Sequence, residues 1–195
     1  MSLTFETQRA SILKFVKAHV KPDRFQHTLR VEKTAIELAH RYGADVESVS
    51  LASVLHDACK DLGTEEMIQD AQNFLDREKI ELEISDAGSA IWHGLAAADL
   101  GYRIFGIEDK DILYSVAFHT TGWYEMSLIA QIIFMADYIE PGRSFKKVKK
   151  ARKLSNNDLE KATIFQMKNS IRHLAKKEQH IYIESVKIYN HWISK

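Results

Sequence analysis

The stretch Leu55–Asp61 places a histidine beside an aspartate, His56 and Asp57, at the end of the apolar run Leu51–Leu55. Burying such a pair without partners costs free energy, because an imidazole and a carboxylate both interact strongly with water. The pair must therefore be exposed to water, or it must bind a positively charged group inside the protein. Imidazole nitrogen and carboxylate oxygen are common ligands of divalent metal ions, so this stretch predicts a metal site.

Three further polar residues interrupt apolar faces elsewhere: His27, His119 and Asp137. A fourth, His93, stands beside Gly94 near an expected helix start. Taken singly, each is most simply a buried side chain with a hydrogen-bond partner. Taken together with His56 and Asp57, they form a set of imidazole and carboxylate groups that suits Mn, Fe, Co, Ni or Zn. The chain has one cysteine, so a thiolate metal cluster and an internal disulfide are excluded.

The elements that carry these residues are expected to be helices, because almost every segment has helical rather than alternating periodicity. The clearest is a helix that follows Lys21-Pro22, with Asp23 as its N-cap and Gly43 at its end. One stripe of it carries His27, Val31, Ala35, Leu38 and Tyr42. The histidine of that stripe should therefore point into the core.

The remaining pattern predicts an all-α protein of roughly nine helices in one unit. A helix from Asp45 or Ser48 to Gly63 is expected to hold the His56-Asp57 pair. The other expected helices with simple bounds are 4–20, 64–74, 110–120, 157–176 and 182–194. One more helix is expected to begin at Gly88 or Gly94 and end at 105, and another to begin after Ser127 and end at Pro141-Gly142. Residues 76–88 are charged and irregular, and we expect a flexible connection there.

Composition places few demands on partners. The 195 residues carry 27 basic and 27 acidic side chains, so nothing calls for a nucleic-acid polymer or a membrane surface. The first ten residues are polar and mixed in charge, unlike a signal peptide, and no stretch reaches the length of a membrane span. We therefore expect a cytoplasmic protein.

The order of these residues resembles the HD-domain superfamily of metal-dependent phosphohydrolases. That family has a lone His, an adjacent His-Asp pair and a distant Asp, and two extra histidines mark its members with two metals. The similarity is closer to the YqeK-type branch, a family of symmetrical diadenosine tetraphosphate hydrolases. The stretches that carry it are Arg24–His27, Leu55–Lys60, Trp92–Gly94, Phe118–Gly122 and Ala136–Arg143.

The resemblance implies an HD-domain helical bundle with additional C-terminal helices. Residues 1–195 would form a single HD-type domain, with a motif core at about 20–145 and C-terminal helices at about 155–195 packed on it. It also implies two divalent metal ions, with iron expected and manganese, cobalt or nickel as alternatives. The implied metal ligands are His27, His56, Asp57, His93, His119 and Asp137.

In the implied site Asp57 bridges the two metals and is catalytic, with His27, His56 and Asp137 on one metal and His93 and His119 on the other. A hydroxide held between two cations is a nucleophile at neutral pH. It would attack an inner phosphorus of a dinucleoside polyphosphate and release ADP or GDP.

Substrate contacts are expected around this site. Lys60 follows His56 by four residues and is a candidate for phosphate binding and catalysis, although a solvated lysine at a helix end is an equal alternative. Arg143 and Arg24 carry guanidinium groups that can bind phosphate oxygens in pairs. Thr120 and Thr121 are further candidates, with simple turn chemistry as their alternative.

Other functions stay open at this point. The protein could be another HD-type nucleotide phosphohydrolase, acting on a monoester, a cyclic nucleotide or an alarmone, because a fold does not determine its substrate. It could also be a non-catalytic nucleotide-binding regulator with structural metals. The basic run from Arg143 to Lys153 is read as a solvated face more readily than as a polyphosphate site. The amphipathic C-terminal helices permit a homodimer.

Overall fold

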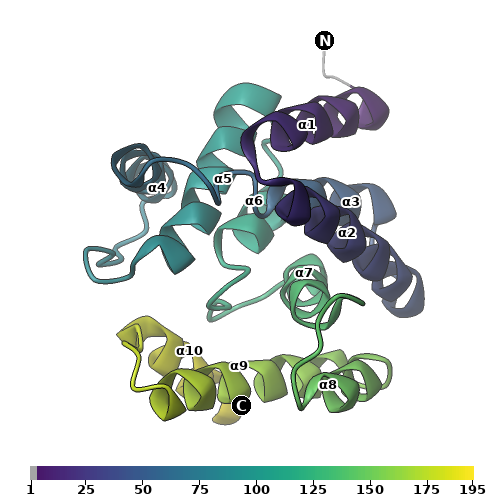
Figure 1. Ribbon diagram of the computed structural model, residues 1–195, viewed down its shortest axis with the longest axis vertical. Coiled ribbons are helices and arrows are strands. Elements are labelled where there is room, and N and C mark those ends of the chain that lie inside the picture. Colours follow the sequence, from purple (N-terminus) through teal and green to yellow (C-terminus); the bar gives the residue numbers. More distant parts are fainter. Residues whose placement is uncertain (1–3) are drawn as a thin grey trace.

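The computed structural model describes residues 4–195, which form ten helices and contain no strand (Figure 1). The all-α prediction is confirmed, and the count of nine is one too low. The helices are α1 Phe5–His19, α2 Pro22–Tyr42, α3 Val46–Leu55, α4 Thr64–Glu78, α5 Ser89–Phe105, α6 Lys110–Ala117, α7 Leu128–Ile139, α8 Val148–Ser155, α9 Leu159–Lys176 and α10 Ile183–Ile193. The additional helix, α8, lies in the basic run.

Helix α2 buries the predicted stripe, including His27, Val31, Ala35 and Leu38. The prediction of Asp23 as its N-cap is wrong, because the helix begins at Pro22 and Lys21 occupies the cap position. Proline suits the first turn, since the N–H that it lacks would have no partner within the helix. The N–H of Lys21 instead donates to Asp61 Oδ2 at 3.0 Å.

Two predicted helices end earlier than expected. Helix α3 stops at Leu55, so His56 and Asp57 follow the helix instead of lying inside one that continues to Gly63. Tight backbone turns succeed it, with the N–H of Ala58 bonded to Leu55 O and that of Lys60 to Asp57 O. Helix α6 likewise stops at Ala117, which leaves His119 beyond its end.

Helix α4 runs longer than expected, to Glu78, so the irregular connection covers residues 79–88. Two aromatic side chains hold this connection. Trp92 Nε1 donates to Ile84 O at 2.7 Å, and the hydroxyl of Tyr182 donates to Glu83 O at 2.6 Å. The second bond ties the connection to the segment that precedes α10.

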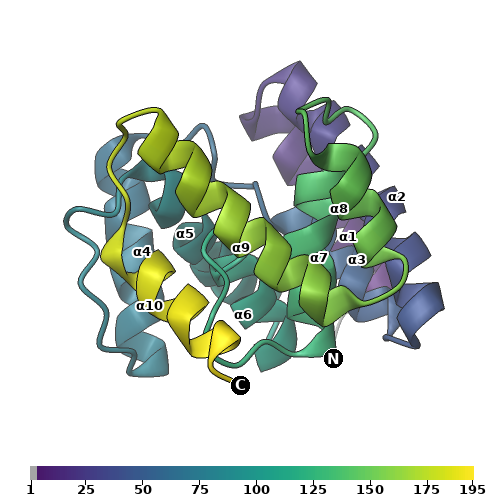
Figure 2. The same cartoon turned by 90° about the horizontal axis from the view of Figure 1, so that it is seen from below.

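The helices form two parts that share α7. Helices α2, α3, α5, α6 and α7 surround the main core, with α1 and α4 on its outside (Figure 1). Helices α8, α9 and α10 lie across the opposite end (Figure 2). They are joined to the main part by a smaller apolar cluster of Phe134, Met167, Ile188 and Trp192. The single domain expected for residues 1–195 stays a prediction.

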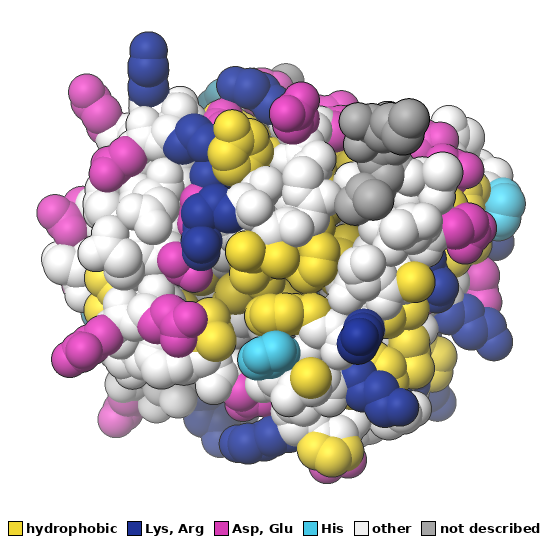
Figure 3. All heavy atoms as spheres, turned by 90° about the horizontal axis from the view of Figure 1, so that it is seen from above, with side chains coloured by type: hydrophobic (Ala, Val, Ile, Leu, Met, Phe, Trp, Pro, Cys, Tyr) yellow, Lys and Arg dark blue, Asp and Glu magenta, His cyan; other side chains and the backbone are white. Residues whose placement is uncertain are grey.

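The face that carries α1 shows apolar side chains among lysine, arginine and acidic side chains (Figure 3). A groove beside α1 contains the ion pair of Arg9 with the buried Glu32, at 2.6 Å between Arg9 Nε and Glu32 Oε1. Within residues 4–195, no helix has both the length and the apolar character that crossing a membrane requires.

Candidate metal centre

Six side chains from five separate parts of the chain meet between α2, α3, α5, α6 and α7. Helix α2 supplies His27, α5 supplies His93 and α7 supplies Asp137, while the turns after α3 and α6 supply the others. The histidines and Asp57 are all at most 5% exposed. Every ligand predicted from the sequence is therefore brought to one place.

Asp57 lies between two groups of histidines. Its Oδ2 is 3.6 Å from His27 Nε2 and 3.3 Å from His56 Nε2. Its Oδ1 is 3.1 Å from His93 Nε2 and 3.8 Å from His119 Nε2. Each oxygen of one carboxylate thus faces its own pair of imidazoles, and each set of three could hold a metal ion.

Asp137 extends the first of these groups, because its Oδ1 lies 3.0 Å from His27 Nε2. In the second group, the Nε2 atoms of His93 and His119 are 3.0 Å apart. Asp57 is thus shared by two groups, one with His27 and His56 and one with His93 and His119. The assignment of these groups to two metals stays a prediction.

The imidazoles are oriented as metal ligands. The Nδ1 atoms of His56, His93 and His119 face the backbone carbonyls of Ser53, Ser89 and Val116 at 2.7, 2.9 and 2.8 Å. A carbonyl can only accept, so each Nδ1 carries the hydrogen and each Nε2 presents a lone pair to the centre.

The same centre contains polar atoms without a partner. Within the described residues, the buried Nε2 atoms of His27 and His56 have no hydrogen bond. Leaving such atoms unpaired is costly, and most buried polar atoms in folded proteins find a partner. A cation between the imidazoles and carboxylates would satisfy them, so these residues fit a metal.

The electrostatics of the centre also favour cation binding. Burial lowers the pKa of His119 to about 3, helped by the positive charges of His93 and His56, and burial lowers the pKa of His93 as well. Although burial opposes its charged form, Asp57 has a pKa well below its usual range because of His56 and His93. At His56 burial favours the neutral form, but Asp57 outweighs it and raises the pKa. The lowered pKa values of His93 and His119 beside an ionised Asp57 are the ones that suit metal ligation, which requires neutral imidazole and charged carboxylate.

Three cationic side chains border the centre on its solvent side. Arg24 Nη1 donates to Asp57 Oδ2 at 2.9 Å, and Arg143 Nη2 donates to Asp137 Oδ1 at 2.6 Å. Lys60 Nζ lies 4.0 Å from Asp57 Oδ1. These side chains are 28–37% exposed, so each has both a contact with the centre and access to a ligand arriving from solvent.

The two threonines are placed differently. Thr120 is exposed, and its hydroxyl lies 3.3 Å from His119 Nε2. Thr121 is buried and donates its hydroxyl hydrogen to Gly122 O at 2.8 Å. The structure therefore brings Thr120 to the centre, whereas the Thr121 hydroxyl is used within the turn.

Glu140 is a residue of the centre that the sequence pattern did not single out. It is 2% exposed, and its Oε1 lies 3.2 Å from His27 Nδ1. Its Oε2 accepts bonds from Arg30 Nε at 2.6 Å and from the N–H of Gly142 at 2.5 Å. Burial opposes the charged form, but these donors lower the pKa of Glu140. Glu140 lies in the stretch Ala136–Arg143 that carries the family resemblance, but no role was assigned to it from the sequence.

A glycine allows the close approach of α5 to the turn that carries His119. A Cβ on Gly94 would lie 2.7 Å from Ala117 O, 3.0 Å from Val116 O and 3.2 Å from His119 Nδ1. The first two contacts are with backbone, which cannot move aside cheaply. The carbonyl of Val116 is also the one that orients His119.

We therefore expect Gly94→Ala to lower the free energy of unfolding by about 1–3 kcal/mol and to weaken metal binding at His93 and His119. Thermal unfolding and metal titration measure the two effects. Gly63→Ala is the matched control, since a Cβ there meets nothing within 4 Å and φ is −59°. Equal behaviour of the two variants would show that the approach of α5 is not constrained at Gly94.

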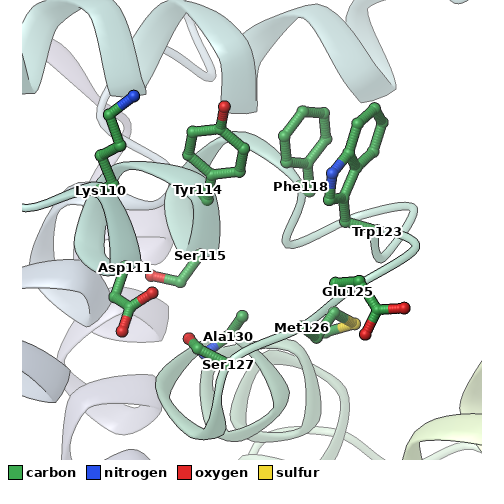
Figure 4. A pocket seen from close by; sticks show the side chains of 10 residues that line it. All are labelled: Lys110, Asp111, Tyr114, Ser115, Phe118, Trp123, Glu125, Met126, Ser127 and Ala130. Atoms are coloured by element: carbon green, nitrogen blue, oxygen red, sulfur yellow. The ribbon is translucent and has the colours of Figure 1, made fainter. Parts of the chain in front are cut away.

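A pocket lined by residues of α6 and of the segment before α7 contains Phe118, the residue before His119. The rings of Phe118 and Trp123 are stacked, with centroids 4.1 Å apart and an interplanar angle of 15°. They line a cavity of about 210 Å³ together with Tyr114 and Lys110 (Figure 4). None of the six predicted ligands lines this cavity, so it is separate from the metal centre.

Comparison with known proteins agrees with this geometry. The HD domain family profile matches residues 24–142. The chain is 38% identical to the Bacillus subtilis (strain 168) protein named symmetrical bis(5'-nucleosyl)-tetraphosphatase, over 95% of this chain and 98% of that protein. It is 42% identical to the protein of the same name from Halalkalibacterium halodurans, over 93% of this chain and 95% of that one.

A solved structure is similar throughout. The crystal structure of a predicted HD superfamily hydrolase involved in NAD metabolism, from Clostridium acetobutylicum, superposes with a TM-score of 0.87 and 34% identity. The match covers 100% of this chain and 99% of that one. The chain therefore belongs to the HD-domain family, in the branch whose members are named symmetrical bis(5'-nucleosyl)-tetraphosphatase.

Proposed function

We propose that the protein hydrolyses dinucleoside tetraphosphates, such as diadenosine tetraphosphate, symmetrically to two nucleoside diphosphates. The observation that carries this proposal is the position of Asp57, whose two oxygens face two separate groups of histidines. The substrate and the symmetrical cleavage come from the names of the relatives that match more than nine-tenths of the chain.

We assign two divalent metal ions to this centre. One ion would be held by His27, His56 and Asp137, and the other by His93 and His119. Asp57 would contribute to both positions. Bound there, two such ions neutralise phosphate oxygens and lower the pKa of water. The mixed nitrogen and oxygen donors, together with the family resemblance, favour iron, with manganese, cobalt or nickel as alternatives.

The chain's own cations supply the substrate contacts. Arg24 and Arg143 direct guanidinium groups at the carboxylates of Asp57 and Asp137, so a phosphate at the mouth of the centre meets two planar donors. Lys60 adds a third positive charge, with its Nζ 3.1 Å from His93 Nε2. The hydroxyl of Thr120 can donate to a phosphate oxygen from beside His119.

The direct test is hydrolysis of diadenosine tetraphosphate by the metal-loaded protein, with chromatographic identification of the products. We expect ADP alone, because cleavage at the central bridge gives two identical halves. AMP plus ATP, or no turnover with iron, manganese, cobalt and nickel each tried in turn, would contradict the proposal. A parallel panel of a nucleotide monoester, a cyclic nucleotide and an alarmone separates this activity from other HD-type hydrolases. Cytoplasmic location and a homodimeric state stay predictions of the sequence.

A further inference from the structure

One residue of the basic run, Arg152 on α8, is bonded inside the protein. Arg152 is half-buried, and its guanidinium donates hydrogen bonds to three backbone carbonyls. Its Nε donates to Ile139 O at 2.8 Å, while its Nη2 donates to Glu140 O at 2.8 Å and to Arg143 O at 3.0 Å. The Nη2 atom has two hydrogens, so each carbonyl has a hydrogen of its own. Arg152 therefore joins the end of α7 to both ends of the turn 140–143.

The end of α7 needs such donors because a proline follows it closely. A helix leaves its last backbone carbonyls without partners inside the helix. Pro141 has no N–H, so it cannot donate to Asp137 O four residues before it. Arginine side chains take the place of backbone donors: Arg143 Nε donates to Asp137 O at 2.9 Å, and Arg152 donates to Ile139 O. The two arginines thus complete the end of the helix that carries Asp137.

The turn that Arg152 holds ends at a side chain of the centre. Arg143 Nη2 donates to Asp137 Oδ1 at 2.6 Å, and the Arg143 side chain is 37% exposed. Among residues 4–195 no hydrogen bond involves Arg143 Nη1, so the hydrogens of that atom are available to a phosphate. The N–H of Arg143 donates to Glu140 O at 2.9 Å, and its carbonyl accepts from Arg152. Both polar groups of the Arg143 backbone are therefore held, and they determine the point from which its side chain extends.

The other functional side chain of this turn has support of its own. The carboxylate of Glu140 accepts from Arg30 Nε and from the N–H of Gly142. Arg152 meets Glu140 at the carbonyl oxygen instead. Loss of Arg152 should therefore displace the Arg143 side chain more than the Glu140 carboxylate.

We propose that Arg152 is a positioning residue for phosphate binding and that it acts through Arg143. The inference rests on the proposed function, in which Arg143 binds a phosphate of the dinucleoside tetraphosphate. The contacts of Arg152 are made to the end of α7 and to the turn, so its effect on the substrate passes through the backbone of Arg143. Lysine cannot take this place, because it has one donor nitrogen where the planar guanidinium uses two.

The test is a double-mutant cycle in steady-state kinetics of diadenosine tetraphosphate hydrolysis at saturating metal. Arg143→Gln is expected to raise KM on the order of tenfold, because a charge-assisted phosphate contact is lost. Arg152→Gln is expected to raise KM by about three- to tenfold, with kcat within about twofold. The double variant should have a KM within about twofold of that of Arg143→Gln, because Arg152 then has no phosphate contact left to position. A KM rise by the same factor in both backgrounds would show that Arg152 acts independently of Arg143 and would overturn the proposal.

Two control variants separate positioning from charge and from stability. Arg152→Lys keeps the positive charge near the end of α7, and we expect its KM to match that of Arg152→Gln; a KM restored by lysine would overturn the proposal in favour of charge alone. Tyr42→Phe removes the hydroxyl that donates to Ser155 O at 2.7 Å, which joins α8 to α2 away from the turn. It should lower the unfolding temperature and leave KM unchanged. An equal rise of KM in Tyr42→Phe and Arg152→Gln would show that any loosening of α8 has this effect, and would also overturn the proposal.

Two further measurements on the same proteins locate the effect. In a metal titration in competition with a chelator, Arg152→Gln is expected to behave as the unsubstituted protein. Weaker metal binding at the position of His27 would place the effect on Glu140 instead of Arg143 and would contradict the inference. Calorimetric titration of the metal-loaded proteins with ADP should show weaker binding in Arg143→Gln and Arg152→Gln, and no additional loss in the double variant.

The ADP titration also keeps this inference distinguishable from the function beneath it. If the unsubstituted protein does not cleave diadenosine tetraphosphate, the proposed function fails, and the pattern of ADP affinities still decides whether Arg152 acts through Arg143. If the protein cleaves the substrate and Arg152→Gln keeps both its KM and its ADP affinity, only the inference fails. Equal ADP affinity in all four proteins of the cycle, or no ADP binding in any of them, would likewise overturn it.

Discussion

Asp57→Asn is expected to remove metal binding at both positions of the centre and to reduce kcat/KM by on the order of a thousandfold or more. The carboxylate faces both pairs of histidines, with each oxygen 3.1–3.8 Å from two imidazole nitrogens. Asparagine keeps the shape but loses the charge and one of the two oxygens. Losing several kcal/mol of charge stabilisation in the transition state corresponds to a rate loss of roughly this size.

Elemental analysis and kinetics of the same preparations measure the effect. The unsubstituted protein should contain two metals per chain, and Asp57→Asn should contain fewer than one. Asp61→Asn is the control, because it lies in the same turn region and retains an oxygen that can accept from the N–H of Lys21. Thermal unfolding confirms that both variants are folded. An Asp57→Asn protein that keeps both metals would contradict the bridging role, and unchanged nucleotide binding without any turnover in either protein would favour a regulator.

The helical periodicity was sufficient to predict the residues that lie inside helices. His27 shares a stripe with Val31, Ala35 and Leu38, and all four are buried in the structure. Asp137 lies on the apolar face of α7, and its Oδ1 is 3.0 Å from His27 Nε2. In both cases the helical pattern assigns the polar residue to the buried face of its helix. The sequence alone therefore predicts that its side chain points into the protein.

The pattern failed where the chain leaves a helix. His56, Asp57 and His119 were expected within continuous helices, yet each follows a helix end. A short i to i+3 turn keeps the spacing of inward residues close to that of a helix, so periodicity cannot distinguish the two. The difference matters chemically, because the Nδ1 atoms of His56 and His119 meet the carbonyls of Ser53 and Val116 near the ends of their helices.

Helix α8 and Glu140 were missed for another reason. The buried face of α8 consists of only Val148, Ala151 and Ser155, which a run of lysines and arginines conceals. Glu140 contacts His27 across 113 residues of sequence. No local pattern records a contact of that kind, and only the fold brings the carboxylate to the imidazole.

Glu140→Gln is expected to weaken metal binding at the position of His27 by about 10- to 100-fold and to leave the position of His93 and His119 nearly unchanged. Glu140 Oε1 faces His27 Nδ1, so the imidazole carries its hydrogen there and presents Nε2 to Asp57 and Asp137. Its other oxygen is held by Arg30 and by the N–H of Gly142. A glutamine has one oxygen for three donors, so its amide nitrogen must face one of them.

A metal titration in competition with a chelator resolves the two positions, and the expected result is that one tight position becomes weak while the other is kept. Glu32→Gln is a close control, because Glu32 is also buried, lies on α2 and accepts bonds from Arg9 Nε at 2.6 Å and Ser50 Oγ at 2.5 Å without touching the centre. Both variants lose a buried charged pair and should unfold at lower temperature. Only Glu140→Gln should change metal affinity. If the two lower the unfolding temperature alike and neither alters the titration, Glu140 stabilises the fold and does not orient His27.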